Sequence, residues 1–352
     1  MSLDEDGKVA VLPGYEAQVS TSGVEHSRRK LEAAVVALDL GETGIGMRPC
    51  MLEEETLGYR CVCSFQFNTN DHQMLEYAMR QQRKVIPLGN SAFPIATPRI
   101  QQAMKLVLVA LNQLDTDSVL RAHLSSITFA SSWRTGAMMK RQNNIINDAT
   151  VSDDDCLVTL NYGQALPIDS AGEDMWKDQA RDCLLQNCHL TTVTGRSKKR
   201  ALVVGREPSR IEDAIYLQMG SSIGKGQVLV TLDKPVSQKK NDWSTVVQYV
   251  KPETSFVHPN ANVMLQALQW LLGRMQMGGT SLLEMYCGCG AHTIPIAKTG
   301  LWGAIVAVEY DQRLVDFCKS NCRINNCLGD QEYDPNDDDH QNTDNIQDKN
   351  KS

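Results

Sequence analysis

Two glycines and one acidic residue have the types and the spacing of a nucleotide-binding site. Gly288 and Gly290 follow a short apolar run, where residues without a Cβ let the backbone approach a ligand closely. Glu309 lies 19 positions after Gly290, at the end of the next apolar run. In nucleotide-binding α/β folds, a carboxylate about 20 residues after the turn accepts hydrogen bonds from the ribose hydroxyls. The pattern predicts a cofactor site, with an ordinary strand-to-helix turn as the alternative.

The residues around this turn distinguish between two cofactors. The dinucleotide fingerprint requires a third glycine at position 293, where this sequence has Thr293. Glu284, four residues before Gly288, stands at the acidic position often seen in the first motif of methyltransferases. Both features favour S-adenosylmethionine over NAD.

The elements that must position this turn form one βαβ unit. Residues 282–287 predict a short buried strand, and a helix is expected to follow the turn as far as Lys298. The continuous apolar run 304–308 is typical of a parallel strand, and a further helix is predicted over 312–324. This arrangement predicts an α/β, Rossmann-like fold.

The preceding sequence predicts an α+β arrangement. Apolar residues at helical spacing indicate helices over 26–40, 100–114, 175–185 and 259–275, the last starting at Pro259. Runs rich in β-branched, aromatic and other apolar residues indicate strands over 59–67, 126–131, 156–162, 189–193, 201–204 and 227–232.

Composition limits the partners and the location that can be expected. The 42% hydrophobic and 22% charged content is ordinary for a globular protein, and no apolar run reaches the roughly 20 residues that span a bilayer. The net charge of −7 lies mainly in residues 330–352, which carry eight acidic and two basic side chains and predict a disordered tail. Any contact with nucleic acid must therefore come from a local basic patch. The acidic N-terminus resembles no targeting signal, so the cytoplasm or nucleus is expected.

The eleven cysteines do not predict a metal site. No C-x-x-C knuckle is matched by a second knuckle or by paired histidines, as zinc sites require. We expect reduced thiols, with Cys318 and Cys322 buried on one face of a helix.

Several segments resemble the cofactor half of the RNA uracil-5 methyltransferase family. They are SFVHPN at 255–260, LQW at 268–270, LEMYCGCG at 283–290 and AVE at 307–309. Weaker matches to the tRNA-specific branch occur in order at 15–18, 58–60, 93–94 and 119–121. The likeness covers about residues 15–328, and the iron–sulfur cysteine array and added β-barrel of the related rRNA branch are not visible.

The resemblance implies a role for each residue of the cofactor site. Tyr286 and the turn at Gly288 and Gly290 would lie along S-adenosylmethionine, and Glu309 would hold its ribose. A packed aromatic that caps the strand is the alternative for Tyr286.

Two positions depart from the family pattern. His258 stands where the family usually has a glutamine that contacts the methionine moiety, and Ala291 replaces a frequently polar residue. An imidazole can donate one hydrogen bond and accept another, so His258 can serve the same contact. A histidine at a helix N-terminus without a ligand is the alternative.

The RNA-binding set is implied more weakly. In the family an arginine pair and a carboxylate on one strand help to seat the target base, and here Arg60 alone matches, since Val62 and Ser64 occupy the other positions. Phe129 could stack near an extruded base, with core packing as the alternative. The basic residues that could bind phosphate, or could belong to a solvated hairpin tip, are Arg196, Lys198, Lys199 and Arg200.

The catalytic groups of the family are not expected in this chain. The family adds a cysteine thiolate to C6 of the uracil, so that C5 can attack the cofactor methyl, and a carboxylate then removes the C5 proton. Those groups lie downstream of the second strand in the family, whereas this sequence becomes acidic and of low complexity near Gly329. We therefore expect a C-terminally truncated member without catalytic residues of its own.

The expected organisation follows from these observations. It comprises a leader and helix at 1–50, an α+β RNA-recognition domain at 51–250, a partial S-adenosylmethionine domain at 251–329 and the acidic tail at 330–352. The expected function is transfer of a methyl group to C5 of a tRNA uridine, in the T-loop, by a monomer with tRNA as partner and no metal or membrane. The alternatives are a non-catalytic tRNA-binding or tRNA-folding module, and a related cofactor binder with another substrate.

Overall fold

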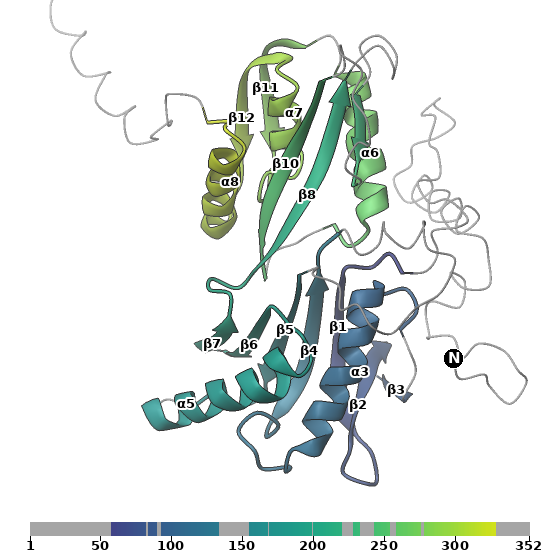
Figure 1. Ribbon diagram of the computed structural model, residues 1–352, viewed down its shortest axis with the longest axis vertical. Coiled ribbons are helices and arrows are strands. Elements are labelled where there is room, and N and C mark those ends of the chain that lie inside the picture. The colour runs from purple at the N-terminus through teal and green to yellow at the C-terminus, as the bar shows by residue number, and fades with distance from the viewer. Residues whose placement is uncertain are drawn as a thin grey trace, which may run out of the picture.

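The computed structural model describes residues 58–81, 84–89, 93–133, 155–167, 169–198, 200–219, 228–232, 243–253, 258–275 and 278–328. Figure 1 shows two stacked bodies, which we call the lower body (described residues 58–205) and the upper body (described residues 206–328). The helix expected over 26–40 and the tail expected over 330–352 lie outside the described residues.

The lower body is built on a seven-stranded sheet in the order β3-β2-β1-β4-β5-β6-β7. Its strands are β1 (Val62–Thr69), β2 (Leu75–Gln81), β3 (Lys84–Gly89), β4 (Leu124–Ser131), β5 (Cys156–Tyr162), β6 (Thr192–Ser197) and β7 (Arg200–Gly205). Neighbouring strands are antiparallel except for the parallel pair of β5 and β6. The chain between β5 and β6 forms a helix, which is the usual crossover between parallel strands.

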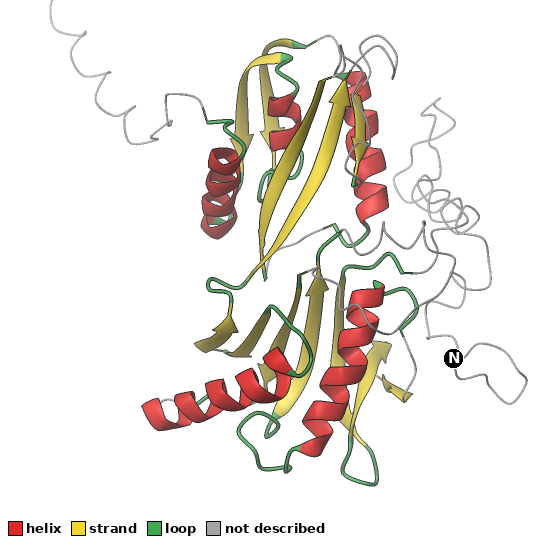
Figure 2. Ribbon diagram, viewed as in Figure 1, coloured by secondary structure: helices red, strands yellow, loops and turns green. Residues whose placement is uncertain are grey.

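Helices cover one face of this sheet and enclose the lower core (Figure 2). They are α3 (Pro98–Gln113), α5 (Ser170–Gln179) and its π-helical continuation η3 (Ala180–Gln186). Thr97 caps α3, because its hydroxyl accepts from the amide of Ile100 at 3.4 Å and Pro98 occupies the first turn. An α+β body at this place in the chain is as the sequence predicts.

The upper body joins an antiparallel sheet to the βαβ unit. The sheet has the order β10-β8-β9, formed by β8 (Arg210–Met219), β9 (Val228–Thr231) and β10 (Trp243–Pro252). Helix α6 (Ala261–Arg274) packs against β9, and its buried face belongs to the upper core. The expected domain boundary at residues 250 and 251 falls inside β10. Pro259 precedes α6, whose N-cap is Asn260.

The βαβ unit confirms the α/β fold class. Strands β11 (Gly279–Met285) and β12 (Trp302–Val308) pair in parallel, with α7 (Thr293–Lys298) between them and α8 (Gln312–Ile324) after them. Leu282 and Ile305 pack on the upper core. The opposite face carries Leu283, Met285 and Val306, which are 62%, 53% and 55% exposed. In the described chain this sheet has these two strands, so one apolar face lies open to solvent.

Helix α8 is attached to the edge of β10 by two asparagines. Asn321 accepts from the amide of Val250 at 2.7 Å and donates to its carbonyl at 2.9 Å. Asn325 accepts from the amide of Gln248 at 2.9 Å and donates to its carbonyl at 2.7 Å. The two side-chain amides thus satisfy backbone groups that an edge strand would leave unpaired.

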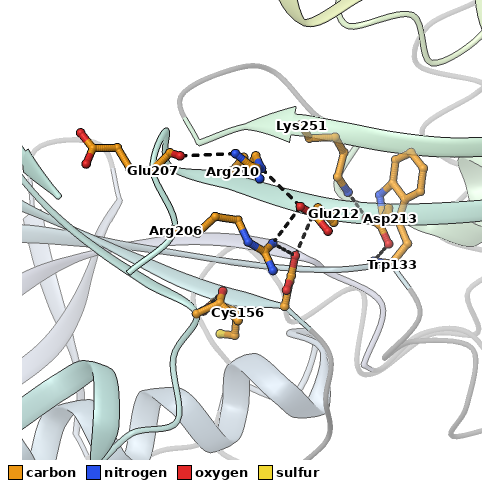
Figure 3. A network of polar contacts seen from close by, with 10 residues as sticks. Trp133, Cys156, Arg206, Glu207, Arg210, Glu212, Asp213 and Lys251 are labelled. Carbon is orange, nitrogen blue, oxygen red and sulfur yellow. Dashed lines mark hydrogen bonds and ion pairs between the residues drawn. The ribbon is translucent and has the colours of Figure 1, made fainter. Parts of the chain in front are cut away.

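Buried charges lie where the lower and upper bodies meet (Figure 3). Lys251 of β10 forms an ion pair with Asp213 of β8, and the Lys251 ammonium lies 3.9 Å from the centre of the Trp133 ring. The amide of Trp133, just beyond β4, donates to Asp213 at 2.7 Å. Beside them Asp155, before β5, pairs with Arg206 and accepts from the amide of Glu212 at 2.7 Å.

Candidate functional site

The glycine turn follows β11 directly and has an unusual backbone. Tyr286, Gly288 and Gly290 have φ angles of +59°, +59° and +88°. The left-handed region favours glycine, and a Cβ added at Gly288 would have no heavy atom within 4 Å. The backbone angle therefore favours glycine at position 288, and its missing side chain leaves open space beside the turn. At Gly290 a Cβ would lie 3.0 Å from both the Cys318 Sγ and the Ile294 Cδ1, so this glycine permits close packing.

Glu309 extends from the end of β12 toward the same turn. Its Oε2 accepts from the amide of Gly288 at 2.9 Å, and its Oε1 accepts from the amides of Tyr310 at 2.7 Å and Asp311 at 2.9 Å. These hydrogen bonds, led by the amide of Asp311, lower the pKa of Glu309 below its usual value. The carboxylate is therefore ionised at neutral pH and acts as an acceptor only.

Glu284 supports the turn from the side of α7. Its Oε2 accepts from the Thr293 hydroxyl at 2.6 Å, and the His292 Nδ1 lies 3.8 Å from its Oε1. Burial raises the pKa of Glu284 and lowers the pKa of His292, so neither environment favours the charged form. Glu284 thus holds the start of α7, a role that its sequence position alone does not specify.

His258 and Ala291 lie on neighbouring parts of the same site. The His258 Nδ1 is 2.8 Å from the carbonyl oxygen of Asn260. Burial, with the nearby His292 as a smaller cause, lowers the pKa of His258, so its imidazole is neutral near pH 7. The carbonyl of Ala291 accepts from the hydroxyl of Tyr249 at 3.0 Å, which ties the turn to β10.

Two tyrosines follow the paired strand ends and are open to solvent. Tyr286 is 82% exposed and Tyr310 is 95% exposed, and both lie next to groups that fix Glu309 or its turn. The exposure of Tyr286 excludes packing as a buried strand cap. Tyr310 was not among the site residues predicted from the sequence. The available signal was an aromatic residue directly after Glu309, the acid expected to bind the ribose. Such rings can stack on a flat heterocycle.

Arg60 lies where the two bodies meet. An isolated β-bridge pairs it with Asn260, beside His258, and another pairs it with Ala96. Its Nε donates to the carbonyl of Val62 at 3.0 Å. The structure therefore brings the family-matched arginine close to the segment that carries His258.

The other predicted RNA-binding residues have different surroundings. Phe129 is fully buried and packs edge-on against Phe65 in the lower core, so core packing is its observed role and no base can stack on it. Arg196 pairs with Glu253 at 3.1 Å, and Arg200 pairs with Glu173. Lys198 is exposed, and Lys199 lies outside the described residues.

Other binding features are limited in the described chain. A hollow of about 730 Å³ lies between β8, β10 and α8, and it includes Arg210, Gln248 and Asp316 but neither Glu309 nor the glycine turn. Among the described residues, no group of three or more His, Cys, Asp or Glu side chains is arranged to hold a metal ion. None of the described helices has the length and apolar character to cross a membrane.

The residues of the turn suit a cofactor with a ribose and a flat base. Open space at Gly288, an ionised carboxylate and two exposed rings occur together at the carboxyl ends of two parallel strands. Ligands of open α/β sheets bind at this end of the strands.

Comparison with known proteins shows that part of this chain is similar to one family. Residues 219–329 match the model of the tRNA (Uracil-5-)-methyltransferase family. A tRNA/tmRNA (uracil-C(5))-methyltransferase of Wolinella succinogenes is 26% identical over 267 residues, which cover 76% of this chain and 56% of the relative. One of Teredinibacter turnerae is 28% identical and covers 71% of this chain and 52% of the relative.

Further similarities are shorter or more distant. A tRNA/tmRNA (uracil-C(5))-methyltransferase of Shewanella sp. (strain ANA-3) is 35% identical over 81 residues, or 23% of this chain and 22% of the relative. The crystal structure of the Pyrococcus abyssi tRNA (uracil-54, C5)-methyltransferase with S-adenosyl-L-homocysteine has a TM-score of 0.46 and 12% identity, over 77% of this chain and 54% of that one.

The chain spans about half the length of the relatives from Wolinella succinogenes and Teredinibacter turnerae. The glycine turn, Glu309 and His258 all fall within the residues that the family model matches. The resemblance drawn from the sequence is therefore confirmed, and residues 219–329 match the tRNA (uracil-5-)-methyltransferase family.

Proposed function

We propose that this chain binds S-adenosylmethionine at the glycine turn and Glu309, and that it serves methyl transfer to C5 of a uridine in tRNA. The observation that carries the proposal is the ionised carboxylate of Glu309, held by the amide of Gly288 beside the open turn. The match of residues 219–329 to the family supports the substrate class.

The carboxylate of Glu309 supplies the ribose contact. A carboxylate has about four acceptor directions, and three amides already use it here. A ribose diol donates two hydrogen bonds, so binding uses the remaining direction and replaces or shares one amide donor. Gly288 allows the backbone to lie close to the cofactor, and Tyr310 offers a ring for the adenine.

His258 supplies the contact to the methionine moiety in this proposal. The His258 Nδ1 lies 2.8 Å from the carbonyl oxygen of Asn260, which only accepts, and 3.4 Å from the Asn260 amide, which only donates. The shorter contact favours the tautomer of the neutral imidazole that carries its proton on Nδ1. The Nε2 atom then accepts, and a cofactor ammonium group is a suitable donor. The bound cofactor supplies an electrophilic methyl group, while these residues orient it.

The tRNA contacts come from the region around Arg60 and from the β6–β7 hairpin. Arg60 lies next to the His258 segment, where a target base would have to approach the cofactor. Lys198 is an exposed cation at the hairpin tip. Arg196 and Arg200 are each paired with a carboxylate, so they can contact phosphate through the guanidinium donors that the pair does not use.

Calorimetric titration of the folded chain with S-adenosylmethionine tests the proposal. We expect saturable binding that Glu309→Gln weakens by about 10- to 100-fold, because charge-assisted hydrogen bonds to the ribose are lost. Asp316→Asn is the matched control, since this exposed carboxylate contacts Gln312 on α8 and should leave binding unchanged. Circular dichroism verifies the fold of each variant.

The titration has outcomes that contradict the proposal. No heat from S-adenosylmethionine, or equal binding by Glu309→Gln, would remove the cofactor site, and tighter binding of NAD would favour the dinucleotide alternative. Methyl transfer to unmodified tRNA is then measured with a radiolabelled methyl group. Binding of tRNA and cofactor without transfer would identify the chain as the non-catalytic module.

A further inference from the structure

The glycine turn is held by two buried side chains that take no part in the cofactor contacts described above. Tyr249 lies on β10, and its hydroxyl donates to the carbonyl of Ala291 at 3.0 Å. Asn321 lies on α8, and its side-chain amide donates to the carbonyl of Cys289 at 2.9 Å. Both side chains are almost completely buried. Two carbonyls of one turn are thus directed toward β10 and α8, which lie beside each other (Figure 1).

Both side chains are fixed by further contacts. The Tyr249 ring packs edge-on against Trp133, with ring centres 5.7 Å apart and ring planes at 70°. Asn321 also donates to the carbonyl of Val250 at 2.9 Å and accepts from its amide at 2.7 Å. Burial raises the pKa of Tyr249 well above its ordinary value, so the hydroxyl keeps the proton that it donates. Strand β10 therefore carries both attachments, directly through Tyr249 and through α8 by way of Val250.

The backbone of the turn explains why such attachments matter. Tyr286, Gly288 and Gly290 have positive φ angles, which non-glycine residues such as tyrosine adopt only at a cost. Glycine also loses more conformational freedom than any other residue when its backbone is fixed. A turn with two glycines and a strained tyrosine keeps one conformation only if its surroundings determine it.

The Tyr249 hydroxyl can be separated experimentally from the rest of the fold. Removing Asn321 would also free the backbone groups of Val250 and disturb the attachment of α8. In the described chain, the hydrogen-bond partner of the Tyr249 hydroxyl is the carbonyl of Ala291. Tyr249→Phe removes that hydrogen bond and retains the ring that packs against Trp133.

We propose that Tyr249 is a positioning residue of the cofactor turn, because its hydroxyl fixes the Ala291 carbonyl and holds the turn in its binding conformation before S-adenosylmethionine arrives. A loop that is already ordered costs less conformational entropy when a ligand binds, so the affinity is higher. The choice of ligand rests on the proposed function, whereas the attachment of the turn is a property of the free protein.

Hydrogen exchange of the chain without ligand tests the attachment. We expect Tyr249→Phe to increase the exchange rate of the amides at 286–293 about three- to tenfold, because local opening of the turn then breaks one hydrogen bond fewer. Tyr77→Phe is the matched control, since the buried Tyr77 hydroxyl also donates to a backbone carbonyl, that of Met104 at 2.8 Å in the lower core. This control should leave exchange at 286–293 unchanged.

Calorimetric titration with S-adenosylmethionine tests the consequence for binding. Tyr249→Phe should bind about three- to tenfold more weakly than the wild type, and Tyr77→Phe should bind as tightly as the wild type. A variant with 4-aminophenylalanine at position 249 retains the ring and a hydrogen-bond donor, so it should recover most of the affinity. A general effect on stability would not produce this pattern, because Tyr77→Phe loses the same kind of hydrogen bond.

Several outcomes would overturn the role of Tyr249. Exchange at 286–293 that is the same in Tyr249→Phe and in the wild type would show that the hydroxyl does not hold the turn. Equal affinity of these two proteins, or an equal loss in Tyr77→Phe, would refute the positioning while leaving the cofactor site intact. A Tyr249→Phe variant that is unfolded by circular dichroism would also contradict the inference, because the hydroxyl would then support the whole fold.

Failure of the proposed function gives a different result. A folded wild type that binds no S-adenosylmethionine would refute the cofactor site and, with it, a positioning role toward that ligand. The exchange experiment uses no ligand, so it still decides whether Tyr249 holds the turn.

Discussion

Glu253 shows how one buried carboxylate joins distant parts of the chain. It lies directly after β10, and its side chain is almost fully buried. Its Oε1 accepts from the Thr159 hydroxyl at 2.5 Å and from the Arg196 Nε at 3.1 Å, and its Oε2 accepts from the Thr194 hydroxyl at 3.0 Å. These donors belong to β5 and β6, so the carboxylate ties the upper body to the sheet of the lower one.

We predict that the contribution of Glu253 to stability depends on pH. Burial by itself would raise the pKa of Glu253, but the hydrogen bonds led by those from Arg196 and Thr159 outweigh it, and the pKa falls below 4.5. A lowered folded-state pKa contributes stability that is present above 4.5 and is lost as the pH falls through the native value.

Glu253→Gln should therefore lower the free energy of unfolding by about 2 kcal/mol at pH 7. The loss should become smaller as the pH falls below 4.5. Urea denaturation at several pH values measures the difference between the two proteins. A difference that does not change with pH would contradict the role assigned to the charge.

The residues of the candidate site were predictable to different extents. Gly288, Gly290 and Glu309 were predictable because each follows a strand that a short stretch of sequence indicates. The positive φ angles of the two glycines also fit their residue type. Glu253 has no such pattern, because its partners Thr159 and Arg196 lie 94 and 57 positions away. Pairing between distant residues also explains why the surroundings of the basic cluster at 196–200 could not be predicted from the sequence. Arg196 and Arg200 each form an ion pair with a carboxylate in the fold.

At the scale of elements, the attachment of α8 to β10 depends on matched spacing. Asn321 and Asn325 are four residues apart on a helix, which is about 6 Å along its axis. Their partners Val250 and Gln248 are two residues apart on a strand, about 6.8 Å. The two side-chain amides of the helix can therefore bond successive backbone groups along the edge of β10, where a neighbouring strand would otherwise pair.

Asn321→Ala should lower the free energy of unfolding by about 3 kcal/mol. The change leaves the amide and carbonyl of Val250 and the carbonyl of Cys289 without their partner, and buried unsatisfied groups cost about 1–3 kcal/mol each. Ser320→Ala, at an exposed position of the same helix, is the control and should cost less than about 0.5 kcal/mol. Equal urea midpoints for the two variants would show that the amide contacts do not hold α8.

The elements themselves were predicted where periodicity is local and strong. The strands and helices of the βαβ unit form where the pattern indicates them, as do α3 and β5, but β11 ends at Met285 and is mostly exposed instead of buried. The long strands β8 and β10 were missed, together with β2 and β3. In β8, Glu212 and Asp213 stand side by side and interrupt the apolar alternation, and the buried carboxylate of Asp213 pairs with Lys251 and accepts from the amide of Trp133. That pairing cannot be read from the strand alone.

At the scale of the whole molecule, the junction ion pair makes the two bodies depend on each other. Asp213 and Lys251 come from the upper sheet, while Trp133 comes from the lower one and contacts both. Cys61 of the lower body also donates its amide to the carbonyl of Pro259 at 2.9 Å, immediately before α6. We expect the two bodies to unfold together in one transition.

Lys251→Met should destabilise the protein by about 3–5 kcal/mol, because it leaves the carboxylate of Asp213 buried without its cation. The double variant Asp213→Asn with Lys251→Met removes both charges and should recover part of that loss. Differential scanning calorimetry measures both effects and the number of transitions. A double variant that is less stable than Lys251→Met, or two separate transitions in the wild type, would contradict this account.

The open apolar face of the β11–β12 sheet also has a consequence for the colloidal behaviour of the protein. Salts such as sulfate are excluded from protein surfaces and favour burial of apolar area, so salting-out should begin where Leu283, Met285 and Val306 meet water. The formal charge of −7 keeps molecules apart at low ionic strength. At 0.15 M salt that repulsion is screened within about 8 Å. Added salt therefore strengthens the attraction between apolar faces and weakens the repulsion between charges, and both effects favour association. Because of this face, we expect the protein to precipitate in concentrated buffers of sulfate-like salts.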